Sequence, residues 1–167
     1  MNLLPLQEQR HLDAAEGWLE LGNWLEANEE LEQICPSLRA HPSVLFMRFE
    51  VYSKAKKWDG AAEIACTLAM LFPERPEAWI SWAYSTRRRS ENGVVEAKRI
   101  LLEAAAKFPA SHWICYNLGC YELQLGNMEA TDLWLKRAFE LDKANEIKLA
   151  ALENDDFQPL WWKKGEI

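Results

Sequence analysis

The sequence has no apolar run long enough to cross a membrane and no surplus of positive charge. A bilayer-spanning helix needs about 18 or more consecutive apolar residues, and no such run occurs. The formal net charge is −7, whereas a nucleic-acid-binding domain normally carries a basic patch. The only dense basic run is Arg87-Arg88-Arg89. We therefore expect no membrane segment and no nucleic-acid partner.

Cysteine pairs, histidine clusters and glycine-rich catalytic motifs are also missing. The four cysteines form no C-x-x-C pair, and a chain with 49% hydrophobic residues does not need disulfides. None of the three histidines belongs to an H-E-x-x-H motif, and no P-loop, G-x-G-x-x-G or G-x-S-x-G motif is present. We therefore predict no catalytic residue, no metal and no cofactor. The N-terminus does not have the pattern of a secretory signal, so the expected location is cytoplasmic.

Tryptophan, by contrast, is abundant, with nine residues in 167. Burying an indole ring removes a large apolar area from water. We therefore expect most of the tryptophans to lie in the core.

A small residue recurs along the chain at nearly constant spacing. Ala27, Ala61, Ala97 and Thr131 stand 34, 36 and 34 residues apart, and the two additional residues fall in the polar stretch 89–93. Apolar or small residues follow each of them at four and seven positions, which places all three columns on one face of a helix. These columns hold Leu31, Ala65, Leu101 and Leu135, and then Ile34, Leu68, Ala104 and Ala138. A further helical stretch precedes each small residue, so each repeat is predicted to be a helix–turn–helix.

Two segments resemble the tetratricopeptide repeat. Trp79-Ile80-Ser81-Trp82-Ala83 resembles the start of such a repeat, and Tyr116-Asn117-Leu118-Gly119-Cys120-Tyr121 with the following Gly126-Asn127 resembles its first helix and turn. The resemblance implies an all-α fold, a right-handed helical-hairpin solenoid of about four units with a C-terminal capping helix. The implied single domain, 1–167, has units at about 8–41, 42–75, 76–111 and 112–145, with the cap and tail at 146–167.

The small column and two departures from the family pattern bear on packing. We expect the small residues to lie where the two helices of a hairpin cross closely, with larger residues around the crossing. In the second unit, Phe49 stands where the family has Gly or Ala, and Arg48 occupies a usually apolar position. At the N-terminus, Leu3, Leu4 and Leu6 are expected to cover the open face of the first hairpin.

The resemblance also implies a binding groove, because the first helix of each hairpin lines the concave face in this family. The partner-binding residues carried over by position are Asp13, Glu16, Glu20, Met47, Glu50, Glu77, Ser81, Tyr84, Arg88, Trp113, Asn117 and Gln124. Five of them are acidic, which favours a basic or amphipathic protein segment, and Tyr84 and Trp113 are aromatics of the kind that anchor interfaces. The alternative is a solvated polar face with no ligand.

The C-terminal tail contains the adjacent pair Trp161 and Trp162. Either the tail docks on the capping helix, or a tryptophan of the pair serves as an oligomer anchor, because adjacent side chains do not easily face one flat surface. Two hypotheses for function follow. The first is a non-enzymatic protein–protein interaction module, acting as an adaptor, scaffold or chaperone-like protein. The alternative is a structural protein that self-associates through its tail or end faces.

Overall fold

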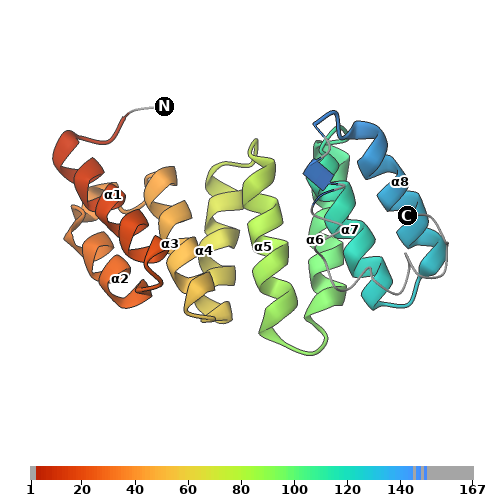
Figure 1. Ribbon diagram of the computed structural model, residues 1–167, viewed down its shortest axis with the longest axis horizontal. Coiled ribbons are helices and arrows are strands. Elements are labelled where there is room, and N and C mark those ends of the chain that lie inside the picture. Colours follow the sequence, from red (N-terminus) through yellow and green to blue (C-terminus); the bar gives the residue numbers. More distant parts are fainter. Residues whose placement is uncertain (1–2, 145, 148, 150–167) are drawn as a thin grey trace. The chain divides into compact units, whose positions relative to one another are not determined.

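The computed structural model describes residues 3–144, 146, 147 and 149, and this part of the chain is helical, without a β-strand (Figure 1). The all-α prediction is therefore confirmed. The eight α-helices there are α1 (Leu6–Glu20), α2 (Trp24–Gln33), α3 (Pro42–Lys54), α4 (Trp58–Leu71), α5 (Pro76–Arg89), α6 (Gly93–Lys107), α7 (His112–Gln124) and α8 (Met128–Leu141), with a short 3-10 helix, η1 (Pro36–Leu38), after α2.

The helices group into two compact units, residues 1–89 and 90–167. In the first unit, α1 and α2 form one hairpin, α3 and α4 form the next, and α5 packs against α4. In the second unit, α6 packs against α7, and α7 forms a hairpin with α8. The boundary falls in the polar stretch 89–93 that the repeat spacing marked as a longer turn. The arrangement of 1–167 as a single domain stays a prediction.

Equivalent residues make the tight turns of three hairpins. Gly22 and Gly126 have φ angles of +78° and +77°, and Lys56, 34 residues after Gly22, has a φ of +56°. A left-handed residue after a helix lets its last carbonyls be satisfied while the chain reverses, and glycine adopts this conformation without steric cost. The turns of these three hairpins therefore share the same backbone conformation, as well as the same position in the repeat.

The small residues that recur along the chain are buried, and their place at the hairpin crossings stays a prediction. Ala27, Ala61, Ala97 and Thr131 are fully buried, and so are the four residues seven positions later. At the crossing of α7 and α8, a Cβ placed on Gly119 would stand 2.8 Å from Leu135 Cδ2. The absence of a side chain on Gly119 therefore lets α7 and α8 approach within direct packing distance.

The second hairpin reverses the sizes of the residues at its crossing. The column that contains Gly119 holds Ala15 in the first hairpin, and the Leu135 column holds Leu31 there. In the second hairpin, the corresponding pair is Phe49 and Ala65, both buried. A large residue on the first helix with a small one on the second occupies about the same total volume as the reverse order, and cores tolerate exchanges that keep the total volume. The departure at Phe49 is thus matched by a change across the hairpin.

Arg48, the second departure, joins an ion-pair cluster at the end of α2. Its guanidinium pairs with the Glu32 carboxylate, which also lies 2.8 Å from an Arg39 nitrogen. Arg39 donates in addition to the carbonyls of Glu32 and Ile34, at 2.7 and 3.1 Å. The hydrogen bond from Arg48 holds the pKa of Glu32 below its usual value. Arg48 also donates to the Leu31 carbonyl at 3.5 Å, so the two arginines satisfy carbonyls that the end of the helix leaves unpaired.

Most tryptophans flank the hairpins instead of filling them. Trp79 is buried, but Trp18 and Trp24 are half-buried against the core of the first hairpin and Trp113 is 37% exposed. A half-buried indole ring packs part of its apolar surface against neighbouring side chains and keeps the rest in solvent. The expectation of a tryptophan core is therefore wrong for six of the seven tryptophans that the structure describes.

The two ends of the chain differ in how far the structure describes them. Of the N-terminal leucines, Leu4 packs against the first core, whereas Leu3 and Leu6 are 95% and 72% exposed, so the covering role expected for those two is wrong. At the other end, the Asp142 carboxylate accepts hydrogen bonds from the backbone N–H groups of Glu146 and Ile147, as at the start of a helix. Ile147 is fully buried. The rest of the predicted capping helix lies outside the described residues.

Candidate functional site

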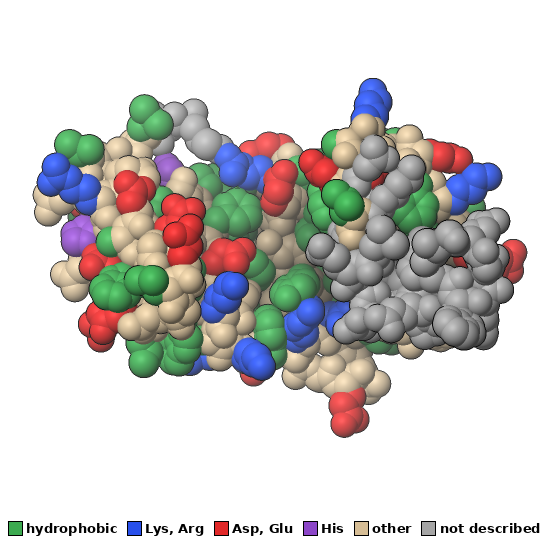
Figure 2. Space-filling view, viewed as in Figure 1, with side chains coloured by type: hydrophobic (Ala, Val, Ile, Leu, Met, Phe, Trp, Pro, Cys, Tyr) green, Lys and Arg blue, Asp and Glu red, His purple; other side chains and the backbone are tan. Residues whose placement is uncertain are grey.

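The first helix carries an acidic stripe. Asp13, Glu16 and Glu20 lie at positions that share one face of α1, next to the face that holds the buried Leu12 and Ala15. All three acidic side chains are exposed. Gln9, one turn earlier, donates a hydrogen bond of 2.7 Å to Asp13. In the view of Figure 2, acidic side chains gather over the α1–α3 part of the surface.

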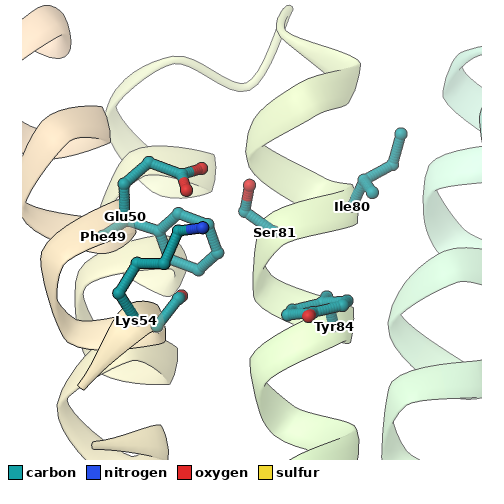
Figure 3. A pocket seen from close by; sticks show the side chains of 7 residues that line it. Phe49, Glu50, Lys54, Ile80, Ser81 and Tyr84 are labelled. Carbon is teal, nitrogen blue, oxygen red and sulfur yellow. The ribbon is translucent and has the colours of Figure 1, made fainter. Parts of the chain in front are cut away.

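A hollow of about 370 Å³ lies between α3 and α5. We call it the α3–α5 pocket; its lining residues are Phe49, Glu50, Ser53, Lys54, Ile80, Ser81 and Tyr84. Figure 3 shows the Glu50 carboxylate and the Ser81 hydroxyl turned toward each other from the two helices, with the Lys54 ammonium beside Glu50. Three of the residues predicted from sequence, Glu50, Ser81 and Tyr84, therefore line one pocket.

Two charges of opposite sign line this pocket without pairing. Glu50 and Lys54 are one turn apart on α3 and both are exposed, yet no ion pair forms between these two described residues. Desolvation by the pocket walls raises the pKa of Glu50 above its usual value, and the attraction of Lys54 only partly opposes this rise. The pocket thus presents a separate acceptor and a separate donor.

Tyr84 is held in place by a cation and a second aromatic ring. The Arg88 guanidinium lies 3.6 Å from the centre of the Tyr84 ring and donates a hydrogen bond of 3.2 Å to the Tyr84 carbonyl. Trp58 meets the ring edge-on, with 6.0 Å between centroids. Tyr84 itself remains 37% exposed. Arg88 therefore adds a positive charge next to the pocket instead of extending freely into solvent.

The other predicted residues are distributed as follows. Glu77 is exposed near the start of α5, and Met47 is half-buried against the core of the first hairpin. In the second unit, Trp113 is 37% exposed and packs edge-on against Tyr116. Asn117 donates a hydrogen bond of 2.8 Å to the Trp113 carbonyl, and Gln124 is exposed. The candidate oligomer anchors Trp161 and Trp162 lie outside the described residues.

Sequence reasoning missed four lining residues of the α3–α5 pocket. They are Phe49, Ser53, Lys54 and Ile80. The correspondence with the family selected one residue per turn on each helix, whereas a pocket between two helices is also lined by the neighbours that face the adjacent helix. The available signal was the spacing of Lys54, four residues after Glu50 on the same face.

Three carboxylates on α1 and α5 have no partner. Glu16, Glu20 and Glu77 form no ion pair or side-chain hydrogen bond in the part of the chain that the structure describes. Carboxylates on other surfaces do pair, for example Asp59 with Arg89 at 3.0 Å. An exposed carboxylate without a counter-charge is available to a positive group from outside.

Burial separates the cysteines, all of which are free thiols. Cys35 is exposed, and the nearby Ser37 hydroxyl lowers the pKa of its thiol. Cys115 and Cys120 are buried, as expected for small apolar side chains, and burial raises the pKa of the Cys66 and Cys115 thiols. The chemical reactivity of the four thiols should follow this order.

Limited iodoacetamide at neutral pH should therefore alkylate Cys35 first. The thiolate is the reacting species, so we expect Cys35 to react roughly tenfold faster than Cys115, or more. Peptide mapping by mass spectrometry after short reaction times measures this order, and Cys35→Ser should remove the fast phase. Alkylation of Cys115 or Cys120 ahead of Cys35 would show that the burial assigned to these helices is wrong.

Metal and membrane features are not found in the described part of the chain. No group of three or more His, Cys, Asp or Glu side chains there is placed to hold a metal ion. None of its helices combines the length and apolar character needed to cross a membrane.

Comparisons with known proteins place the fold. No family model and no curated protein matches the sequence, but solved structures do. TTC0263, a thermophilic TPR protein of Thermus thermophilus, is 19% identical, with 95% of this chain and 83% of that chain covered and a TM-score of 0.71. Two MamA structures match as well. The RS-1 double mutant is 12% identical, with 83% of this chain and 77% of that chain covered and a TM-score of 0.69. The MSR-1 structure is 18% identical, with coverages of 81% and 77% and a TM-score of 0.65. The chain therefore has the tetratricopeptide-repeat fold.

Proposed function

We propose that this protein is a non-enzymatic interaction module that holds a basic or amphipathic segment of another protein on the α1, α3 and α5 surface of its first unit. The observation that carries the proposal is the set of unpaired carboxylates on α1 and α5, Glu16, Glu20 and Glu77. Repeat solenoids commonly use such extended surfaces to bind other proteins.

Electrostatics supports a basic partner. The chain carries a net charge of −7, so a positively charged segment is attracted before contact and gains ion pairs on arrival. Exposed pairs of this kind are weakened by salt, because the screening length is about 8 Å at physiological ionic strength. Binding to this surface should therefore weaken as salt is raised.

An aromatic side chain supports the amphipathic character of the partner. Tyr84 is 37% exposed and is held in place by Arg88 and Trp58. A pre-positioned aromatic ring gives an apolar side chain of the partner a contact area without a large loss of side-chain entropy. The proposed surface thus combines acidic groups on α1 with an apolar contact on α5.

Reversing charge on α1 should weaken partner binding. We expect Glu16→Lys/Glu20→Lys to reduce retention of the partner roughly tenfold, since each exposed pair is replaced by repulsion. The control is Glu29→Lys/Glu63→Lys, which changes two exposed glutamates on the second helices. Each replacement adds two positive charges, so both variants have a net charge of −3 in place of −7.

The measurement is quantitative mass spectrometry of lysate proteins retained by the wild type and by the two variants. Loss of the same proteins from the α1 variant alone supports the proposed surface. Equal losses from both variants indicate a general charge effect, and unchanged retention by the α1 variant removes α1 from the binding surface.

A further inference from the structure

The α3–α5 pocket differs in charge from the acidic surface on α1. Glu50 and Lys54 both line it, and a Glu followed by a Lys four residues later on a helix usually forms a favourable pair. Here the two side chains form no ion pair within the described chain, so each can bind a ligand group. The Arg88 guanidinium on the Tyr84 ring adds a second positive charge nearby.

This arrangement suits neither sign of charge fully. A lysine or arginine entering the pocket pairs with Glu50 but meets Lys54, and an aspartate or glutamate pairs with Lys54 but meets the Glu50 carboxylate, which the pocket walls already desolvate. Repulsion of this kind is a common source of specificity. An uncharged group that both donates and accepts hydrogen bonds meets neither penalty.

The pocket walls favour a polar group on a short apolar stem. Phe49 is buried, Ile80 is half-buried, and the exposed edge of Tyr84 completes the apolar lining. The Ser81 hydroxyl faces Glu50 across the gap between the helices (Figure 3). A volume of about 370 Å³ is at the low end for ligand pockets, enough for one side chain with part of its backbone.

We propose that the α3–α5 pocket binds the carboxamide side chain of a glutamine or asparagine in the partner segment. The amide NH2 donates to the Glu50 carboxylate, the amide oxygen accepts from Lys54 or the Ser81 hydroxyl, and the methylene stem lies against Phe49 and Tyr84. This inference rests on the proposed function, in that the same segment lies along α1 and α3. It adds which side chain the pocket selects.

Short peptides with a single variable residue test this selectivity. The probes are acetyl-Gly-Ala-X-Ala-Gly-amide with glutamine, glutamate, lysine or norleucine at X, titrated against the ¹⁵N-labelled protein while the amide signals of Glu50, Ser81 and Tyr84 are followed. We expect the glutamine peptide to bind roughly five- to tenfold more tightly than the other three, the difference expected from one or two hydrogen bonds to charged groups. Equal or tighter binding of the lysine or glutamate peptide, or no shift with any probe, would overturn the proposal.

Two pocket variants provide a second test, because they should raise the affinity for peptides of opposite charge. Glu50→Gln should raise the affinity for the glutamate peptide, and Lys54→Met should raise it for the lysine peptide, because each removes the repelling charge. The matched controls, Glu29→Gln and Lys136→Met, alter exposed residues outside the pocket and should leave all four affinities unchanged. If both pocket variants shift every probe alike, the pocket does not select by charge and the proposal fails.

The probes carry no charge besides residue X, so they do not depend on the acidic surface of α1. Selectivity for glutamine combined with unchanged partner retention by the α1 variant would refute the proposed function alone. Loss of retention by that variant without glutamine selectivity would refute the pocket assignment alone.

Discussion

Phe49→Ala should destabilise the protein by about 3–5 kcal/mol, the usual cost of removing a buried aromatic side chain. Phe49 is only 5% exposed and stands at a hairpin crossing where other repeats have alanine or glycine. The loss exceeds the transfer free energy of the ring because Ala65 opposite is too small to fill the space. Urea unfolding followed by circular dichroism measures the change in the free energy of unfolding.

A second substitution, at Ala65, should restore the stability that Phe49→Ala removes. Ala65→Leu alone should destabilise by about 1–3 kcal/mol through overpacking, whereas Phe49→Ala/Ala65→Leu restores the small–large order of the other crossings and should recover most of the stability. The two single losses sum to about 4–8 kcal/mol, so a double variant that loses only about 1 kcal/mol corresponds to a favourable interaction energy of about 3–7 kcal/mol. Additive effects would mean that Phe49 and Ala65 do not share one volume. Phe49→Leu, a milder change, keeps the comparison measurable if the alanine variant unfolds.

Lys98→Met should destabilise the second unit by about 3–5 kcal/mol, because it leaves a buried carboxylate without its cation. Glu122 is 4% exposed, its Oε1 lies 2.7 Å from the Lys98 ammonium, and the Asn127 side chain donates to its other oxygen at 2.7 Å. One carboxylate thus ties α6, α7 and the turn before α8 together. Thermal or urea unfolding again gives the measurement.

Replacing both charges separates the pair from the packing around it. Lys98→Met/Glu122→Met removes the unpaired charge and keeps apolar volume, so its stability should lie near the wild type or above it. The matched control, Lys107→Met/Glu103→Met, removes an exposed pair one turn apart on α6 and should change stability by less than about 1 kcal/mol. If the double replacement at Lys98 and Glu122 costs as much as the single one, the hydrogen bond from Asn127 to Glu122 carries the effect instead.

The hairpins were predictable because their signals are local. Small residues at 34- and 36-residue spacing, with apolar residues four and seven positions later, place a helix face and its closest approach without knowledge of any neighbour. The turns at Gly22 and Gly126 follow from the conformational freedom of glycine. The acidic stripe on α1 was predictable for the same reason, since helical spacing alone aligns Asp13, Glu16 and Glu20.

The α3–α5 pocket was only partly predictable, because two helices that are separate in sequence build it. Glu50, Ser81 and Tyr84 were expected on a shared surface, but the contribution of Phe49 and Lys54 depends on the distance between α3 and α5. The prediction that most tryptophans lie in the core was wrong for a related reason. The size of a residue alone does not reveal whether close-packed helices leave room for it.

The sequence by itself determined where the helices begin and turn, which faces are apolar, and which small residues recur on the buried face, because helical periodicity is a property of the local chain. Only the tertiary structure decided that Glu122 is buried beside Lys98, that Arg48 caps α2, and that Glu50 and Lys54 line a hollow without pairing. Burial and pairing depend on which side chains of neighbouring helices approach one another, and that distance is set by the packing of whole hairpins.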